Sequence, residues 1–340
     1  MGVSKKHVLA ACLDAVKILD AGNAISRRRS DATILTILAY HRVLDLDPAG
    51  YAFDEELVSA TTAGFDEQMR YVKQGFDAIT FAELAEGLDG GGLPRRPIII
   101  TFDDGYGDNY TAAFPILKKW GLPATIFLAT AHIGTNEPFW FEKVACWIKK
   151  TEARSLRLDS GTRAYEYALV GDRARVIRDV QDLLKSVDEN THGNLISSLE
   201  REAGVKLDPT GIVRPLTWEE VSEMSGSNIE FGAHSETHLN MAMLSDGVLQ
   251  KEVCGSKRAI EERIKKPVTV FSYPFGGAKA FSRRTEERVR DAGFKFAVSY
   301  VDGVNSIAGL KRFEMKRVHV ERYDGFALFK GRLSLRTIFG

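Results

Sequence analysis

Cysteine is scarce in this chain, with three residues among 340. Cys12, Cys146 and Cys254 show neither the spacing of metal ligands nor that of a redox pair, and their odd number argues against a disulfide framework. We therefore expect small, unpaired residues in a reducing compartment, which predicts a cytoplasmic protein.

An excess of charge of one sign is also lacking, because 46 lysine and arginine residues balance 46 aspartate and glutamate residues. This balance gives no electrostatic footprint for a nucleic acid or an extended polyanion, so we expect no nucleic-acid partner. A neutral substrate is compatible with it.

Long apolar runs are missing as well, and no stretch approaches the roughly 20 apolar residues of a membrane span. Near the N-terminus, the apolar run at 8–13 is interrupted by charges from Asp14 onward before a signal-peptide core is complete. The segment 1–32 is expected to hold a short amphipathic helix that packs on the main domain. A peripheral membrane contact, helped by the basic run 27–29, is the alternative. The apolar positions of this helix are Val8, Ala11, Cys12, Val16, Ile18 and Leu19.

What the chain does contain is a regular alternation of two patterns. Apolar, strand-like runs lie near 33–40, 76–80, 97–102, 123–129, 229–234, 268–273, 295–300 and 316–320. Helical patterns lie between them, at 65–73, 110–120, 249–264 and 284–292. Strands that alternate with helices favour a largely parallel sheet, here closed into a (β/α) barrel.

One connection is far longer than a link between a strand and the next helix requires. It runs from the strand that ends near Thr130 to the one that begins at Asn228. We therefore expect the barrel to comprise 33–136 and 214–340, interrupted by a mostly helical insertion at 137–213 that builds one wall of the substrate cleft. Helices are predicted at 173–185 and 191–202, and the aromatic segment 137–141 predicts either a small core or a surface on which a ligand stacks.

Two motifs follow predicted strands. Thr101-Phe102-Asp103-Asp104-Gly105-Tyr106 comes after the run 96–100, so Asp103 and Asp104 should lie at a carboxyl strand end. Because successive strand residues point to opposite sides, one carboxylate can ligate a cation while the other handles a proton.

The second motif, His234-Ser235-Glu236-Thr237-His238, follows the strand-like run 228–233. If the chain coils through a helical turn here, both imidazoles reach one ion. Two imidazoles and a carboxylate then form a facial set with open coordination positions. That set favours catalytic zinc, with iron, cobalt, nickel and manganese as alternatives.

Together with Phe271-Ser272-Tyr273-Pro274-Phe275-Gly276, these motifs resemble the first three motifs of the polysaccharide deacetylases, the NodB-homology proteins of carbohydrate esterase family four. The resemblance covers roughly residues 33 to 134 and 214 to 325, and includes Leu216 to Glu220. It implies a distorted barrel of seven or eight strands, one divalent cation, and hydrolysis of the N-acetyl group of an amino sugar in a glycan.

The resemblance also implies roles for individual residues. Asp104, His234 and His238 would ligate the metal, and Asp103 would be the general base. Tyr273 matches the position whose backbone N–H stabilises the oxyanion. An arginine usually precedes this part of the motif, but Ser272 stands there, so the group that orients Asp103 is left open among Arg42, Arg317 and the segment 298–305.

The general acid has two candidates. His41 follows the apolar run 34–40 and resembles the Tyr-His opening of the circularly permuted branch, which includes biofilm poly-N-acetylglucosamine deacetylases. His319 lies in Arg317-Val318-His319-Val320, with the alternation of a strand. We favour His41, because it is expected at a strand end and His319 within a strand.

Two other classes of function compete with deacetylation. One is metal-dependent hydrolysis of another carbon–nitrogen amide bond, such as that of a ring amide. The other is a catalytically silent barrel that only binds sugars, against which the intact set Asp103, Asp104, His234 and His238 argues.

Overall fold

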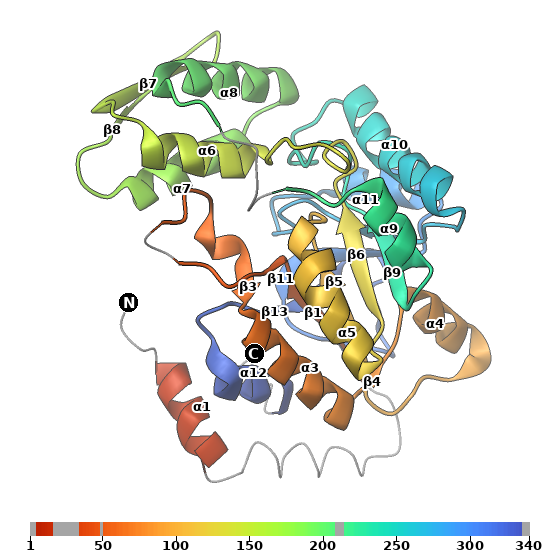
Figure 1. The fold of residues 1–340 in the computed structure, drawn as a ribbon. Coiled ribbons are helices and arrows are strands. Elements are labelled where there is room, and N and C mark those ends of the chain that lie inside the picture. Colours follow the sequence, from red (N-terminus) through yellow and green to blue (C-terminus); the bar gives the residue numbers. More distant parts are fainter. Residues whose placement is uncertain (1–4, 16–33, 48–49, 208–213, 335–340) are drawn as a thin grey trace.

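The computed structural model of the protein describes residues 5–15, 34–47, 50–207 and 214–334. Seven parallel strands form a closed ring in the order β1-β13-β11-β10-β9-β6-β5, with β5 pairing back to β1 (Figure 1). This confirms the predicted barrel. The strands of the ring are β1 (Ile34–Tyr40), β5 (Pro97–Phe102), β6 (Ala124–Leu128), β9 (Ile229–Ala233), β10 (Val270–Ser272), β11 (Phe296–Asp302) and β13 (Met315–His319).

Shorter strands flank the ring. β4 (Asp77–Ala78) pairs with β5, β12 (Asn305–Ser306) pairs with β1, and β2 (Arg42–Val43) pairs with β3 (Val58–Ala60). The run predicted as a strand at 76–80 therefore contributes only two residues. They pair with the first residues of β5 and are not part of the ring.

Two apolar clusters explain why the barrel strands read as continuous apolar runs. In β5 every residue is buried, but Ile99 packs with Leu35, Phe127 and Val298, whereas Ile98 and Ile100 pack with Phe65 and other residues of the surrounding helices. Alternate residues thus face two different apolar layers, as expected for a parallel sheet covered on both sides.

Helices cover the outside of the barrel and confirm the alternation that the sequence predicts (Figure 1). The helical patterns at 65–73, 249–264 and 284–292 coincide with α3, α10 and α11, and that at 110–120 with η3 and α5. The helical elements around the barrel are η1 (Glu55–Leu57), α3 (Thr62–Gly75), α4 (Phe81–Glu86), η2 (Gly87–Gly91), η3 (Asn109–Ala113), α5 (Phe114–Trp120), α9 (Trp218–Ser225), α10 (Asp246–Ile264), α11 (Arg283–Asp291) and α12 (Gly325–Ser334).

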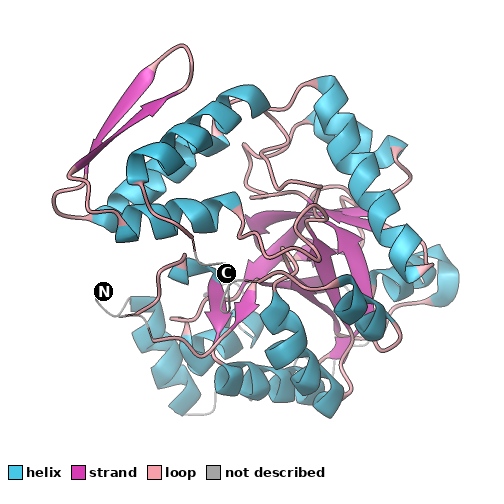
Figure 2. Cartoon of the chain, turned by 45° about the horizontal axis from the view of Figure 1, so that its top comes forward, coloured by secondary structure: helices cyan, strands magenta, loops and turns pink. Residues whose placement is uncertain are grey.

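The long connection forms a layer of its own beside the barrel, with α6 (Trp140–Lys150), α7 (Arg173–Lys185) and α8 (Glu189–Ala203). It also contains a hairpin of β7 (Ser155–Asp159) and β8 (Ala164–Ala168), which projects from these helices (Figure 2). The sequence-based description as mostly helical missed this hairpin. Leu156 and Leu158 of β7 join the buried core of these helices, and that core reaches the barrel at Tyr106.

The N-terminal helix α1 (Lys5–Ala15) packs against α12, and Lys330 forms an ion pair with Asp14. Two of the predicted apolar positions are wrong: Ala11 and Cys12 are exposed, whereas Ala10 is buried against Leu328. The face is set by contact with α12, which the helical spacing alone does not reveal. The predicted apolar positions Val16, Ile18 and Leu19 and the basic run 27–29 lie outside the described residues. Within the described part of the chain, no helix combines the length and apolarity needed to span a membrane.

Candidate functional site

The chemically active residues gather where the barrel strands end. Asp103 and Asp104 follow β5, His234 follows β9, and His41 follows β1. Parallel strands bring their carboxyl ends to one rim of a barrel, so segments far apart in the sequence meet there. Asp104 lies in the left-handed region with a φ of 74°, and its carbonyl accepts a hydrogen bond from Ala129 N–H of the neighbouring strand end.

The segment between the two histidines is a loop and not the helical turn that the spacing suggested. Ser235 and His238 both have positive φ, at 64° and 58°. Side chains supply the acceptors that a helix would otherwise provide: Ser235 Oγ accepts from His238 N–H, and Glu252 accepts from the N–H groups of Glu236 and Thr237. The imidazoles therefore converge through this hydrogen-bonded loop.

Asp104, His234 and His238 form a compact, buried cluster. Asp104 Oδ1 lies 3.5 Å from His234 Nε2 and 3.2 Å from His238 Nε2, and all three ligand atoms lie within 4.8 Å of one another. Within the described residues, Asp104 Oδ1 accepts no hydrogen bond although it is buried. A buried carboxylate oxygen facing two imidazole nitrogens is the donor set of a divalent transition metal, so the residues fit the implied cation.

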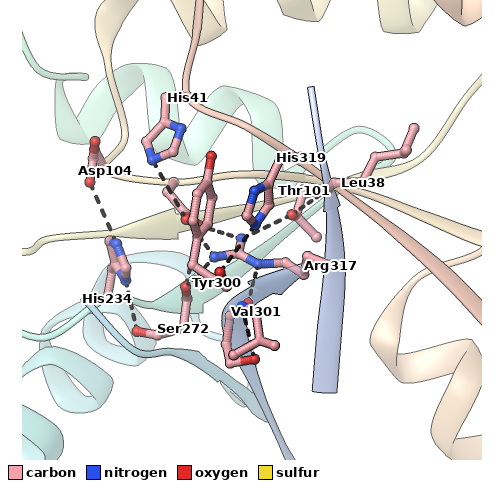
Figure 3. Close-up of polar contacts among 12 residues, drawn as sticks. Leu38, His41, Thr101, Asp104, His234, Ser272, Tyr300, Val301, Arg317 and His319 are labelled. Carbon is pink, nitrogen blue, oxygen red and sulfur yellow. Dashed lines mark hydrogen bonds and ion pairs between the residues drawn. The ribbon is translucent and has the colours of Figure 1, made fainter. Parts of the chain in front are cut away.

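The surroundings of His234 fix the orientation and the protonation state of its imidazole. Its Nδ1 donates a hydrogen bond of 2.7 Å to the carbonyl of Ser272, which leaves Nε2 without a proton and aimed at Asp104 (Figure 3). Burial lowers the pKa of His234 to about 4, so the imidazole is neutral near neutral pH. The neutral form is the one that binds a metal.

Asp103 is held by Arg317, one of the groups that the sequence left open. Arg317 Nη1 and Nη2 lie 2.8 and 2.6 Å from the two carboxylate oxygens, and both side chains are fully buried. Burial alone would raise the pKa of Asp103, but the Arg317 guanidinium and the neighbouring His234 hold it well below its usual range. Asp103 is thus a carboxylate at any ordinary pH.

Arg317 is itself fixed from several sides. It donates to Thr101 Oγ1, to Ser272 Oγ and to the carbonyl of Ser299, so serine at 272 supports an arginine that comes from another strand (Figure 3). Arg42, the other arginine considered, pairs with Asp108 at 2.8 Å instead.

The two candidate acids lie in different surroundings. His41 lines the pocket described below, and its Nε2 is 3.9 Å from Asp103 Oδ2. His319 stacks on Tyr300 with ring centroids 3.8 Å apart and donates from Nε2 to the carbonyl of the same tyrosine. His319 lies within β13 as expected, but as its last residue, so it too stands at a carboxyl strand end. The ring stacking and the hydrogen bond to Tyr300, and not the place in the strand, distinguish the surroundings of His319 from those of His41.

Tyr273 does not offer the free amide expected of it. Its N–H donates to the carbonyl of Val298, because the β10–β11 pairing continues past the end of the strand, and its side chain is buried and stacked on Phe281. Phe275, two residues on, has a φ of 61° and lines the pocket. Its N–H finds no acceptor in the parts of the chain that the structure describes. The sequence motif includes Phe275, but its left-handed backbone is visible only in the structure, so the motif comparison selected Tyr273 instead.

The cluster opens into a pocket of about 540 Å³. Its walls come from the segment 54–59, which includes η1 and the start of β3, from Phe141, Gln181 and Lys185 of the inserted helices, and from the segment 320–323 after β13. The volume lies within the range of roughly 300–1,000 Å³ that is common for small-ligand sites, so more than an acetyl group fits. Sequence reasoning predicted a wall from the insertion, and its aromatic segment 137–141 includes Phe141, but it did not identify Gln181 or Lys185.

Comparisons with known proteins identify the family of the chain. The family described as polysaccharide deacetylase matches residues 90–297 of the chain. Poly-β-1,6-N-acetyl-D-glucosamine N-deacetylase of Staphylococcus epidermidis is 37% identical over 108 residues, which cover 29% of this chain and 37% of that protein. A Bacillus subtilis protein, YxkH, which carries the name of a polysaccharide deacetylase, is 23% identical over 244 residues, 71% of this chain and 59% of the relative. The matches thus span less than two thirds of these relatives.

Solved structures share the fold. The deacetylase PplD from Streptococcus pyogenes, in complex with acetate, superposes with a TM-score of 0.57 at 18% identity, covering 86% of this chain and 95% of that one. IcaB from Ammonifex degensii gives 0.55 at 20% identity, with 88% and 98% covered. At these identities the likeness concerns the fold alone.

Proposed function

The chain belongs to the polysaccharide deacetylase family, and from this premise we propose that it hydrolyses N-acetyl groups of amino sugars in a glycan, releasing acetate. The observation that carries the proposal is the placement of a buried ligand set, Asp104, His234 and His238, beside a separate ionised carboxylate, Asp103, at the base of one pocket. A metal-dependent amide hydrolase uses this division between metal ligand and base.

Asp104, His234 and His238 would hold one divalent cation. When bound, such a cation polarises an amide carbonyl and makes water more acidic. Zinc is our first choice because two imidazoles and a carboxylate with open positions form its usual catalytic set, and cobalt, nickel, iron and manganese accept the same donors.

Asp103 would act as the general base. Its carboxylate stays ionised because Arg317 compensates it, so it can take a proton from the attacking water. His41 would act as the general acid and protonate the amine that leaves, since its ring faces the same pocket from the β1 side. The Phe275 N–H, in place of that of Tyr273, would stabilise the oxyanion.

For the substrate we propose an N-acetylated glycan, with β-1,6-linked N-acetylglucosamine oligomers as the first to test. The relative from Staphylococcus epidermidis is named for that polymer. Support from this chain comes from the outer wall of the pocket, where Tyr323 is 51% exposed and Arg322 and Glu321 lie next to it. An exposed aromatic ring beside charged side chains suits a sugar, which offers both apolar faces and hydroxyl groups.

Release of acetate from a panel of glycans tests the proposal. Metal-free and zinc-loaded protein would be incubated with β-1,6- and β-1,4-linked N-acetylglucosamine oligomers and with a ring amide such as allantoin. We expect acetate from a glycan only with metal, and a loss of about 10²–10⁴-fold in Asp103→Asn with zinc retained. Turnover of the ring amide alone would favour the other amide hydrolase. Bound zinc with no turnover of any substrate would favour the silent sugar-binding barrel.

A cytoplasmic location and a peripheral membrane contact through α1 are further proposals. The location is supported by the three cysteines, which are all unpaired. The contact is supported by Leu9, which is 43% exposed on α1. Sedimentation with anionic vesicles tests the contact, and equal recovery of the wild type and Leu9→Ser in the pellet would reject this role of Leu9.

A further inference from the structure

The backbone of His238 is held in a conformation that it would not adopt alone. Its φ of 58° lies in the left-handed region, where a side chain with a Cβ is strained. Such conformations cost free energy and persist at functional sites only when the surroundings impose them. The groups that contact this backbone therefore determine where the His238 imidazole points.

Two side chains hydrogen-bond to the His238 backbone, one on each side. Ser235 Oγ accepts from its N–H at 3.0 Å, from within the same loop. Trp140 Nε1 donates to its carbonyl at 3.0 Å, from 98 residues away in the sequence. Trp140 is the first residue of α6, so the second of these restraints comes from the insertion and not from the barrel.

The indole of Trp140 is itself immobilised. It is 7% exposed and contacts His192 of α8 edge to face, with ring centroids 5.0 Å apart. On another side it contacts Phe275 at 5.7 Å, and the Phe275 ring packs edge-on against the His238 imidazole at 4.7 Å. Trp140 thus restrains His238 through its carbonyl and, by way of Phe275, through its ring.

The residues on either side of Trp140, Phe139 before α6 and Phe141 within it, also contact the His238 ring. Phe141 lies 5.1 Å and Phe139 lies 6.1 Å from the His238 ring, both in edge-to-face geometry. His238 Nδ1 is buried and has no hydrogen-bond partner within the described residues. Unlike His234, whose Nδ1 donates to a carbonyl, His238 is therefore oriented by packing and by its backbone.

We propose that the insertion is a structural part of the metal centre, with Trp140 as the positioning residue that fixes His238 for coordination. The inference rests on the proposed metal site, and it assigns to the inserted helices a role in metal affinity besides that of a pocket wall. Residues that orient a metal ligand typically change metal affinity by about 10–100-fold when they are replaced.

Trp140→Phe tests the proposal, because it removes the indole N–H and keeps an aromatic ring. Trp147→Phe is the matched control: Trp147 lies on the same helix, is 1% exposed, and its Nε1 has no partner within the described residues. Zinc affinity of the full chain would be measured by competition with a chromophoric chelator. The melting temperature of the metal-free proteins would show how much stability each substitution costs.

We expect zinc to bind about 10–100-fold more weakly to Trp140→Phe and with wild-type affinity to Trp147→Phe, even where both variants melt at a lower temperature. Equal affinities in the wild type and Trp140→Phe would overturn the inference and leave the metal site intact. Absence of zinc binding by the wild type would overturn both this inference and the proposed metal site. If Trp140→Phe does not fold, β-(3-benzothienyl)alanine at position 140 decides, since it replaces the N–H by sulfur in the same shape.

Discussion

Replacing Arg317 with methionine is expected to convert Asp103 from a permanent carboxylate into a group that titrates near neutral pH. Arg317 makes the two shortest contacts to this carboxylate and is fully buried, so methionine fills a similar volume without charge. Asp103 then remains buried without its guanidinium, and desolvation is the factor that raises its pKa.

The magnitude follows from the behaviour of buried carboxyl groups, whose pKa can reach about 8–9. At neutral pH only about 1–10% of Asp103 would then be ionised, which lowers kcat/KM about 10–100-fold through protonation alone. Stability should fall too, because removing one partner of a buried ion pair costs about 3–5 kcal/mol.

The sign of the pH dependence should also reverse. In the wild type the depressed pKa of Asp103 contributes stability above its ordinary value, and that contribution is lost as the pH falls. In Arg317→Met the folded pKa lies above the ordinary value, so the free energy of unfolding falls as the pH rises between the two.

Profiles of kcat/KM between about pH 5 and 10, with zinc content measured in parallel, test this prediction. Arg42→Met is the matched control, because Arg42 is also buried but pairs with Asp108. It should lose stability without moving the acid limb of the profile. An acid limb in Arg317→Met that coincides with the wild type, together with activity within a few-fold, would refute the reasoning.

Other variants examine single residues of the site. His238→Ala should lose tight zinc binding, because it removes one of three ligands, and unchanged metal content by atomic absorption would reject the site. His41→Ala should lower kcat about 10²–10⁴-fold with zinc content and melting temperature nearly constant. His319→Ala should mainly lower the melting temperature, since its ring is stacked on Tyr300, and a collapse of kcat with intact folding in this variant alone would transfer the acid role to His319. Tyr323→Ala should raise KM for oligomers more than it lowers kcat, and an unchanged KM would remove Tyr323 from substrate binding.

The barrel could be predicted from the sequence because its strands are buried on both sides. Such strands are short apolar runs, and the run at 97–102 coincides with β5. The paired aspartates and the histidine motif could be located for a related reason, since each directly follows a run of this kind. Knowing that strand ends share one rim is enough to expect them close together.

The partner of Asp103 could not be predicted in the same way. Arg317 is 214 residues from Asp103 in the sequence, and the two meet only because β1 pairs with both β5 and β13 when the ring closes. Trp140 and His238 meet through the packing of an insertion on the barrel, for which the sequence gives no register. These contacts depend on tertiary structure, whereas the strands depend on local pattern.

Two sequence-based predictions of local structure were wrong. Ser155 to Ala168 contains two runs of alternating apolar and polar residues, typical of a hairpin, within a segment described as mostly helical. The loop at 234–238 was expected to coil because its histidines are four residues apart. Ser235 and Glu252 satisfy its backbone instead, and a spacing says nothing about such acceptors.

The central claim is that Asp104, His234 and His238 hold the cation on which deacetylation depends. Titrating metal-free protein with zinc while recording acetate release from a β-1,6-linked N-acetylglucosamine oligomer tests it most directly. We predict that activity rises linearly and reaches its plateau at about one zinc ion per chain, and that His238→Ala stays inactive over the same range. Acetate release by the metal-free protein, or full activity of His238→Ala at one equivalent of zinc, would contradict the account.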